Sequence, residues 1–413
     1  MDKYKILRYS ILILFLAFFS FFAFEHFLLG GGSAASVDAL CPFGGFETLI
    51  TFFMTGNLVP RIMISSMILA LGVILTVIIF RRGFCGVICP FGTINELLGK
   101  ITKKKITIPK NVDSKLRWIK YIVLIAILIG TAITGTLVFR EYDPFVTFFH
   151  FGKGLFWDYN AEEAALYAIS GSILVIVLLA AIFIERAWCK YLCPLGAITA
   201  MFSKIGFTKI SRNKKTCIDC KICDKNCPMN VDVSTVDEVK SAECIDCGIC
   251  VNSCPKKSLD IKTFGKTISK YVYIIGVVLL LMLVIGVSKA FDVWQSVPQI
   301  TQVSDISKVN PEDIKGWMTL SNVSQMTGIP LVTLITGLDL PPNVDVNIQM
   351  KSIATTYGIT FDTEAVRDFV LNYKPTQTVV KETCPYGLHN ESYPGTCGLY
   401  KDVDGNKICD LSE

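Results

Sequence analysis

Charged residues are scarce in this chain of 413 residues: they make up 18% of it, whereas 52% of the residues are hydrophobic. A soluble globular protein is usually nearer a quarter charged, so this composition indicates an integral membrane protein. Histidine is rarer still, with only His26, His150 and His389, and no C-x-x-C-H motif is present for haem attachment. A b-type haem would need His26 and His150 at one depth in the membrane, so haem is poorly supported.

Long hydrophobic runs are abundant instead. Crossing a bilayer takes roughly 20 residues, and five runs approach that length, near 8–29, 60–80, 117–138, 164–185 and 269–288. The runs "ISGSILVIVLLAAIFI" and "YVYIIGVVLLLMLVIGV" are apolar all round and lack the polar face of a helix on a soluble core. The sequence therefore predicts an α-helical multi-pass membrane protein with about five transmembrane helices.

Lysine and arginine gather at alternate ends of these runs. The N-terminus, the segment "GKITKKKITIPKNVDSKLRWIK" and the stretch after the fourth run are basic, whereas "REYDPFVTFFHFGKGLFWDYNAEE" is mainly acidic. Because basic flanks stay in the cytoplasm, we expect a cytoplasmic N-terminus and an extracytoplasmic C-terminus. The basic clusters lie at the membrane ends, so no nucleic-acid partner is indicated. The segment "GGGSAAS" resembles a signal-peptidase site, but we favour retention of the first helix.

Sixteen cysteines divide unevenly between the two sides of the membrane in this topology. Twelve face the cytoplasm, and four face outward: Cys41, Cys384, Cys397 and Cys409. Because cytoplasmic thiols stay reduced, the inner cysteines are expected to bind metal, whereas the outer ones can form disulfides. Four outer cysteines allow three pairings, and the sequence does not choose among them.

The segments "CIDCKICDKNCP" and "CIDCGICVNSCP" both read C-x-x-C-x-x-C-x-x-x-C-P. In bacterial ferredoxins three cysteines of such a loop bind one [4Fe-4S] cluster, and the fourth binds the other cluster. A zinc site would use two widely separated cysteine pairs, which is a poorer match. Two ligand sets are therefore predicted: Cys217, Cys220, Cys223 and Cys254 for cluster 1, and Cys244, Cys247, Cys250 and Cys227 for cluster 2.

A second pattern, C-x-x-x-C-P, occurs at the inner ends of the second and fourth hydrophobic runs. It comprises Cys85 and Cys89 in "RRGFCGVICPFG", and Cys189 and Cys193 in "ERAWCKYLCPLG". If the chain stays helical past Arg82, the two cysteines of a pair share one helix face. The proline and glycine that follow are expected to end the helix.

The similarity between these two regions extends outward, because a P-F-x-x-F segment precedes each run, in "CPFGGFETLITFF" and in "DPFVTFFHF". Cys41 and Cys85 are 44 residues apart, and Asp143 and Cys189 are 46 apart, which indicates an internal repeat. A duplicated hairpin would bring the two cysteine pairs face to face. We therefore expect a third metal centre, of the iron–sulfur kind, on these four thiolates. The alternative is that the thiols only pack or stabilise a turn.

The paired C-x-x-x-C-P motifs and the two-cluster block at 217–254 resemble the NapH/MauN group of membrane polyferredoxins, with relatives in NosR and CcoG. The resemblance covers roughly residues 1–290. It implies electron transfer between membrane quinol and redox partners, commonly within a larger respiratory system. The last 120 or so residues have no counterpart in short members of the group. No flavin-attachment domain of the NosR type precedes the first helix, and the outer region does not read like the β-sandwich tail of the CcoG type.

Ionisable residues at membrane depth are costly and are therefore candidates for proton exchange with a quinone. Glu25 and His26 interrupt the first hydrophobic run near its outer end. Asp143 and His150 lie in the outer segment before the fourth run, and Glu47 lies in the outer segment before the second. The alternative is that these are interfacial side chains that reach water. The expected quinone is menaquinone or, in an archaeon, methanophenazine.

The region after the last run is expected to lie outside the membrane. Residues 291–381 read as short helices of a small, mostly α domain, which we interpret as a docking or spacer module. The tail 382–413 contains a candidate calcium loop, with side chains at EF-hand positions 1, 3, 5, 9 and 12: Asp402, Asp404, Asn406, Asp410 and Glu413. The glycine stands at position 4 instead of 6, and a solvated acidic turn is the alternative.

The predicted organisation has five parts: a membrane domain over 1–210, a two-cluster ferredoxin-like domain over 211–262, a fifth transmembrane helix over 263–290, and the outer regions 291–381 and 382–413. The predicted function is electron transfer between a membrane quinone pool and iron–sulfur clusters, as a subunit of a larger redox complex. Whether the chain is enzymatic, as a quinol dehydrogenase or oxidoreductase subunit, stays open. The alternatives are a CcoG-like metal-reducing or maturation factor and a redox-sensing regulator.

Overall fold

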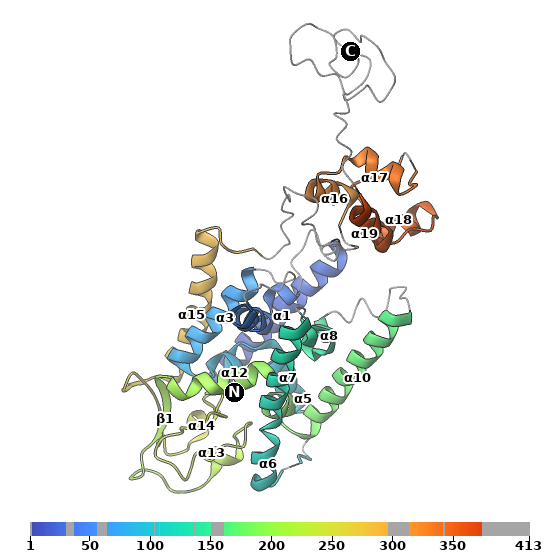
Figure 1. Cartoon of the computed structure of the whole chain (residues 1–413). Coiled ribbons are helices and arrows are strands. Elements are labelled where there is room, and N and C mark those ends of the chain that lie inside the picture. The colour runs from blue at the N-terminus through green and yellow to red at the C-terminus, as the bar shows by residue number, and fades with distance from the viewer. Residues whose placement is uncertain are drawn as a thin grey trace, which may run out of the picture.

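The computed structural model describes residues 2–29, 37–55, 64–134, 137–149, 161–295 and 314–373, apart from positions 103, 107, 315, 317 and 342. These residues are mainly helical, with one three-stranded sheet (Figure 1). His150 and the whole tail lie outside the described residues. The candidate calcium loop and the outer cysteines other than Cys41 therefore stay sequence predictions.

Most of the helices belong to the membrane part. In chain order they are α1 (Lys3–Leu29), α2 (Pro42–Thr55), α3 (Ile64–Phe80), α4 (Gly83–Val87), α5 (Pro90–Leu98), α6 (Lys110–Leu116), α7 (Ile119–Thr134), α8 (Pro144–Phe149), α10 (Ala161–Phe183), α11 (Ala187–Tyr191), α12 (Pro194–Phe202) and α15 (Lys270–Ala290). Short 3₁₀ turns at Val37–Leu40, Val138–Tyr142 and Ser203–Ile205 connect some of them.

Three helical stretches of the described chain are long and apolar enough to cross a membrane: Lys3–Leu28, Lys110–Thr134 and Lys270–Ala290. The second and fourth predicted spans correspond to shorter apolar helices, Ile64–Phe80 and Ala168–Phe183. The protein is thus a helical membrane protein, and the number of five spans stays a prediction.

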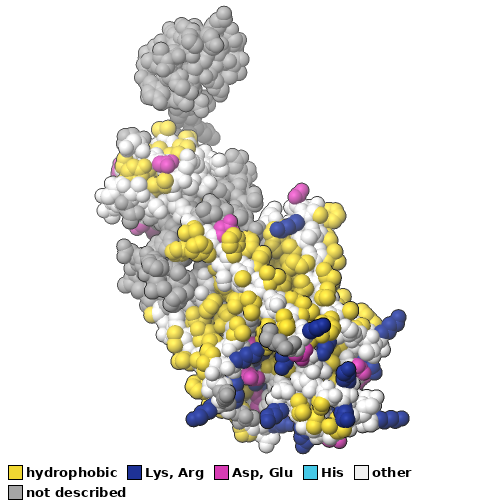
Figure 2. All heavy atoms as spheres, turned by 180° about the vertical axis from the view of Figure 1, so that it is seen from behind, with side chains coloured by type: hydrophobic (Ala, Val, Ile, Leu, Met, Phe, Trp, Pro, Cys, Tyr) yellow, Lys and Arg dark blue, Asp and Glu magenta, His cyan; other side chains and the backbone are white. Residues whose placement is uncertain are grey.

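The outer faces of these helices are apolar. Phe18 on α1, Ile125 on α7 and Leu279 on α15 are each about half exposed or more. In Figure 2 hydrophobic side chains cover the middle of the molecule, and lysine and arginine side chains gather at its lower end. A contiguous apolar surface of this extent is typical of a membrane-facing region.

The backbone breaks where the second and fourth predicted spans reach their arginines. Arg81, after α3, has a φ of 52°, and Arg186, after α10, has a φ of 53°. These left-handed residues end one helix and redirect the chain into the short helices α4 and α11. The helix therefore does not continue past Arg82, and the condition for each cysteine pair to share one helix face is not met.

The two prolines of the C-x-x-x-C-P motifs begin helices instead of ending them. Pro90 is the first residue of α5, and Pro194 is the first residue of α12. Proline suits the first helical position, because its φ is already helical and its missing N–H would have no partner there. Cys89 and Cys193 are the N-caps of these helices, so the cysteines of a pair do not share one helix face.

The cysteine-rich block between α12 and α15 is built on the antiparallel sheet β1 (Thr208–Arg212), β2 (Leu259–Thr263) and β3 (Lys266–Ile268). Ile210 pairs with Ile261 across the two longer strands, and both side chains are buried. Two short helices, α13 (Ile222–Lys225) and α14 (Ile249–Ser253), follow β1 and precede β2 along the chain, and they pack on each other. Figure 1 shows this block, which we call the dicluster block, at one end of the membrane helices.

The C-terminal described region forms a helical unit with its own core. It contains α16 (Leu320–Thr327), α17 (Leu331–Gly337), α18 (Met350–Tyr357) and α19 (Thr363–Asn372). Val323, Ile353 and Val366 are fully buried within it. In Figure 1 this unit lies at the opposite end of the membrane helices from the dicluster block. Its position outside the membrane stays a prediction.

Candidate redox centres and the pocket beside them

The four cysteines assigned to cluster 1 line one pocket of the dicluster block. Cys220 is exposed, and the other three are partly buried. The Sγ of Cys217 accepts a hydrogen bond from Arg212 Nη1 at 3.6 Å, and the Sγ of Cys254 accepts one from the backbone N–H of Ser258 at 3.3 Å. Hydrogen bonds to ligand sulfurs are a feature of iron–sulfur sites. These four residues fit a [4Fe-4S] cluster near the surface.

The cysteines assigned to cluster 2 lie deeper. Cys244, Cys247 and Cys250 are 7–8% exposed and belong to the main hydrophobic core. The Sγ of Cys227 accepts a hydrogen bond from the backbone N–H of Val231 at 3.4 Å. Cys227 is also within electrostatic range of Cys244, Cys247 and Cys250. The four residues therefore come together on the inner side of the block.

In the described part of the chain, no three His, Cys, Asp or Glu side chains converge on a single-ion position. A [4Fe-4S] cluster spreads its four cysteine ligands around a cube of iron and sulfide, so it does not require such convergence.

The structure also brings together the four cysteines of the C-x-x-x-C-P segments. In every pair among them, the two thiols are close enough for the charge of one to affect the pKa of the other: Cys85, Cys89, Cys189 and Cys193. Burial, together with the neighbouring thiols, raises the pKa of Cys89 to about 12. A thiol in this position stays protonated at neutral pH unless a metal stabilises its thiolate form.

The two C-x-x-x-C-P segments have matching local geometry. The Sγ of Cys89 accepts a hydrogen bond from the N–H of Gly92 at 3.4 Å. The Sγ of Cys193 accepts one from the N–H of Gly196 at 3.2 Å. Each second cysteine thus caps the helix that follows it, in the manner of an N-cap side chain.

An arginine from each segment reaches the turn of the other. A Cβ added at Gly92 would lie 3.1 Å from Arg186 Nη1, and one added at Gly196 would lie 3.2 Å from Arg82 Nη2. Arg186 Nη1 also donates to the carbonyl of Cys85 at 2.8 Å. The two glycines therefore leave room for a reciprocal crossing of buried cations.

Arg186 is neutralised by Glu96 of the other segment. Arg186 Nη2 lies 2.7 Å from Glu96 Oε2, and Arg8 Nη1 of α1 lies 2.7 Å from Glu96 Oε1. Tyr9 is a third donor residue to this carboxylate. Burial alone would raise the pKa of Glu96, but the charge of Arg186 and the hydrogen bond from Arg8 hold that pKa far below its usual range. We call Arg8, Glu96 and Arg186 the Glu96 triad.

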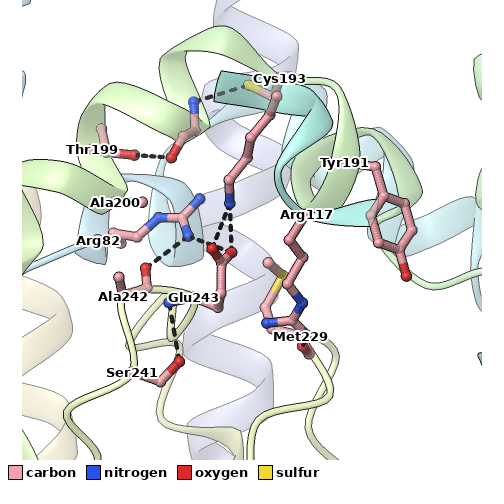
Figure 3. Close-up of polar contacts among 12 residues, drawn as sticks. Arg82, Arg117, Tyr191, Cys193, Thr199, Ala200, Met229, Ser241, Ala242 and Glu243 are labelled. Atoms are coloured by element: carbon pink, nitrogen blue, oxygen red, sulfur yellow. Dashed lines mark hydrogen bonds and ion pairs between the residues drawn. The ribbon is translucent and has the colours of Figure 1, made fainter. Parts of the chain in front are cut away.

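Arg82 has a different counter-ion. Figure 3 shows its guanidinium beside Ala242 and Glu243 of the dicluster block. Arg82 Nη1 donates to the carbonyl of Ala242 at 3.0 Å and lies 3.4 Å from Glu243 Oε2. Lys120 of α7 binds both carboxylate oxygens, at 2.7 and 2.6 Å. We call Arg82, Glu243 and Lys120 the Glu243 triad.

Arg82 retains two unsatisfied donors. The side chain is completely buried, yet its Nε and Nη2 have no hydrogen-bond partner among the described residues. The guanidinium lies within electrostatic range of Cys85, Cys189 and Cys193. Buried donors are normally satisfied, and charged donors bind anionic acceptors well. The four cysteines and Arg82 therefore fit a thiolate-bound, anionic iron–sulfur cluster.

An apolar pocket adjoins three of these cysteines. Its walls include seven aromatic side chains, three cysteines and one carboxyl group: Phe19, Phe43, Phe84, Phe91, Phe139, Phe145, Trp188, Cys89, Cys189, Cys193 and Asp143. The rings of Phe139 and Trp188 are nearly parallel, at 13°, with centroids 6.5 Å apart. Ligand pockets commonly combine such apolar walls with a few polar groups. A flat apolar headgroup with one or two polar oxygens would suit this pocket.

Of the predicted proton-exchange residues that the structure describes, Asp143 lines this pocket. It is 6% exposed, and its Oδ1 accepts a hydrogen bond from the N–H of Phe145 at 2.9 Å. Glu25 and His26 lie near the end of α1 and are not among the described lining residues. Glu47 is buried, accepts a hydrogen bond from Thr131 and lines a neighbouring pocket together with Asp143.

Sequence reasoning missed the inward course of the P-F-x-x-F segments. It placed Cys41 and Asp143 at the far end of the hairpins from the C-x-x-x-C-P cysteines, whereas both line the pocket with Cys89 and Cys189. It also missed the two carboxylates of the triads. The adjacent arginines in "RRGFC" were the available signal, since buried arginines require counter-ions.

Three family models match segments of the chain. The model described as a 4Fe-4S binding domain matches twice, at residues 62–109 and 168–215, and each match contains one C-x-x-x-C-P segment. The model described as a 4Fe-4S dicluster domain matches residues 209–267. The N-terminal domain of the MJ0753 family matches residues 376–413, outside the described structure.

Relatives match between about a third and somewhat more than half of the chain. The chain is 30% identical over 216 residues to YccM of Escherichia coli, which is named as an electron transport protein, covering 50% of this chain and 58% of YccM. It is 30% identical over 240 residues to the MJ0750 protein of Methanocaldococcus jannaschii, covering 57% and 86%. It is 27% identical over 156 residues to the ferredoxin-type protein NapH of Escherichia coli, covering 36% and 48%. The matches thus span about half the length of YccM and NapH. No solved structure matches the chain.

Proposed function

Because this chain belongs to the NapH/MauN type of membrane polyferredoxins, which is related to NosR, we propose that it exchanges electrons between a lipid quinone and its iron–sulfur clusters. The proposal is supported by YccM, which is named as an electron transport protein, by the ferredoxin-type protein NapH, and by the 4Fe-4S domain models that match the chain. The quinone, its site and the membership of a larger redox complex are our proposals.

One observation carries this proposal. The aromatic pocket has the buried carboxyl of Asp143 in its wall together with three of the four cysteines of the C-x-x-x-C-P segments. We call these four cysteines the membrane cysteines. A quinone headgroup in this pocket would contact a proton-exchanging group and a redox ligand set at once. The pocket suits menaquinone or methanophenazine equally, since both present a flat apolar ring system.

The chemistry balances for either direction of flow. Oxidation of one quinol to quinone releases two electrons and two protons, and reduction consumes the same. When bound, [4Fe-4S] clusters accept or release one electron each, at potentials set by their surroundings. Asp143 would accept or return a proton at the headgroup, and Glu47 in the adjoining pocket would continue the proton route. The aromatic walls would keep bulk water from the headgroup.

The chain's cysteines would hold three clusters in this proposal. The dicluster block would hold two, on the two ligand sets assigned from the sequence. The third would be bound by Cys85, Cys89, Cys189 and Cys193, with the unsatisfied Nε and Nη2 of Arg82 available to its sulfurs. The predicted cytoplasmic position of the dicluster block would give a soluble redox partner access to cluster 1.

Iron quantitation with EPR tests the ligand sets. We expect about twelve irons in the anaerobically purified protein, because three clusters carry four irons each. Serine at Cys85, Cys89, Cys189 and Cys193 should lower this to about eight and leave the dicluster signals unchanged. About eight irons in both proteins would refute the third centre.

Reduction by a quinol analogue tests the pocket. We expect Asp143→Asn to slow quinol-dependent cluster reduction by about tenfold or more, within the range for loss of a proton-transferring group. Dithionite should still reduce the variant completely. Glu25→Gln is the control, since Glu25 is another acidic residue of the membrane part, on α1, and is not among the lining residues of the pocket. Equal quinol-dependent rates in both variants would exclude Asp143 from the reaction.

A further inference from the structure

The membrane part and the dicluster block touch backbone to backbone at Gly86. This glycine follows Cys85 on α4. A Cβ at Gly86 would lie 2.3 Å from the carbonyl oxygen of Ile245 and 3.1 Å from the Cα of Cys247. No side chain fits there without moving one of the two backbones. The glycine thus allows the segment that bears Cys85 to pack directly on the loop that bears Cys247.

Helix α1 ties the two sides of this contact together. Tyr4 donates its hydroxyl hydrogen bond to the carbonyl of Cys247 at 2.6 Å. Arg8 donates to the carbonyl of Gly86 through Nε at 3.0 Å and through Nη2 at 2.8 Å. Both side chains are at most 1% exposed. Buried hydrogen bonds of this kind restrict movement of the two backbones relative to each other.

The arginines at the end of α3 hold the start of the same loop. Arg81 donates to the carbonyls of Val239 and Ser241, at 2.9 and 2.7 Å, and lies 3.5 Å from the carboxylate of Asp246. Arg82 binds Ala242 and Glu243, as described above. The loop from 239 to 246 is therefore held along its length by two adjacent cations.

Glu243 supplies a carboxylate that the second C-x-x-x-C-P segment lacks at the position matching Glu96. Arg186 is neutralised by Glu96, which stands seven residues after the second cysteine of the first segment. The matching position in the second segment is Ala200. The carboxylate near Arg82 is instead supplied by Glu243, from the dicluster block. Docking of this block therefore completes the charge balance of the membrane part.

The proposed ligand sets differ in their distance from this contact. The cluster 2 residue Cys244 lies in the loop from 239 to 246, Cys247 directly follows that loop, and both are buried. Cys220 of cluster 1 is exposed at the outer pocket. The order along the molecule is therefore the membrane cysteines, then the cluster 2 set, then the cluster 1 set.

We infer that Gly86 and Glu243 position the cluster 2 ligand loop against the membrane cysteines, and that this contact is the crossing point for electrons between the membrane and the dicluster block. The inference rests on the proposed third centre. Electron transfer falls steeply with distance, so a residue that sets the contact would also set the rate. Cluster 1 is then the exchange site for a soluble redox protein.

The test replaces Gly86 by Ala and by Val, and Glu243 by Gln, in the full-length protein. Gly286→Ala is the matched control, because nothing lies within 4 Å of a Cβ at that helical position. The readouts are iron content, thermal midpoint, the magnetic interaction between centres in EPR, and the rate at which a quinol analogue reduces the dicluster signals. Dithionite reduction serves as the reference.

We expect all variants to retain about twelve irons, as the three proposed four-iron clusters require. Gly86→Ala and Glu243→Gln should slow dicluster reduction by tenfold or more and weaken the magnetic interaction, and Gly86→Val should have the larger effect of the two glycine variants. The membrane centre should be reduced at the wild-type rate, which a general loss of stability would not allow.

Wild-type rates and an unchanged magnetic interaction in Gly86→Ala and Glu243→Gln would overturn the inference. If Gly86→Val loses iron, these two milder variants decide the outcome. About eight irons in the wild-type protein would instead refute the third centre and thus the proposed function, a result distinguishable from failure of the contact. Slowing in Gly286→Ala equal to that in Gly86→Ala would also refute the inference.

Discussion

The first C-x-x-x-C-P segment, α3 to α5, and the second, α10 to α12, share the geometry of the second cysteine and differ in their electrostatics. In both, the second cysteine is the N-cap of the next helix, and a glycine lies under a crossing guanidinium. The left-handed arginine is not at a matching position: Arg81 lies four residues before Cys85, and Arg186 lies three before Cys189. The first segment carries its own carboxylate, Glu96, which neutralises Arg186. The second has Ala200 at that position, and Arg82 depends on Glu243 from another part of the chain.

This difference separates what holds the membrane part together from what holds the dicluster block on it. The Glu96 triad joins α1, α5 and the start of α11, all within the membrane part. The Glu243 triad joins α3 and α7 to the dicluster block. Loss of the first should therefore disturb the whole molecule, whereas loss of the second should act mainly on docking.

The largest effect is expected for Glu96→Gln. The substitution leaves Arg8 and Arg186 buried without a counter-ion, and removal of one partner of a buried ion pair typically costs about 3–5 kcal/mol. The free energy of unfolding in detergent should fall by that amount. The double variant Glu96→Gln with Arg186→Gln should be less destabilised than the single variant. A loss below about 1 kcal/mol, as for an exposed ion pair, would contradict the role given to the Glu96 triad.

Glu243→Gln should be less destabilising, at about 2 kcal/mol. Its side chain is 12% exposed, and Arg82 keeps its hydrogen bond to Ala242, so the result should lie below the usual range for a fully buried pair. The measurement is unfolding in detergent, with limited proteolysis to report release of the dicluster block. A destabilisation equal to that of Glu96→Gln would remove the distinction between the two triads.

Lowering the pH should reduce the free energy of unfolding through protonation of Glu96 in the Glu96 triad. Its pKa is lowered in the folded protein, so its contribution is fully present above the unfolded-state pKa and is lost as pH falls toward the folded-state value. Stability should stay level from neutral pH to about 5 and then decline by up to about 1.4 kcal/mol per pH unit from this group. The decline should be smaller in Glu96→Gln, and equal slopes would exclude Glu96 as its source.

The smallest effects are expected at the two matching glycines. Alanine at Gly92 or Gly196 would bring a Cβ to about the closest tolerated distance from Arg186 or Arg82, and overpacking costs about 1–3 kcal/mol in rigid cores. Because arginine side chains can shift, we expect about 1 kcal/mol at each position. Effects that differ by more than about 1 kcal/mol would show that the segments are less alike than their backbones indicate.

The cysteine spacing indicated the family and the iron–sulfur domains, and the comparisons confirmed both. The hydrophobic runs predicted a helical membrane protein, which the long apolar helices confirmed. The two ligand sets of the dicluster block stay predictions, although their residues lie together as expected. The sequence left open whether the helix continues past Arg82, because the left-handed turn at Arg81 has no local signal such as glycine.

The amino-acid sequence by itself determined the features that depend on neighbours along the chain: apolar runs, cysteine loops, and the proline and capping cysteine that begin α5 and α12. Only the tertiary structure decided which charges meet. Arg8 and Glu96 are 88 positions apart, and Arg82 and Glu243 are 161 apart. A buried cation needs a counter-ion, but it does not specify where in the chain that counter-ion lies, because packing of distant helices brings the two together.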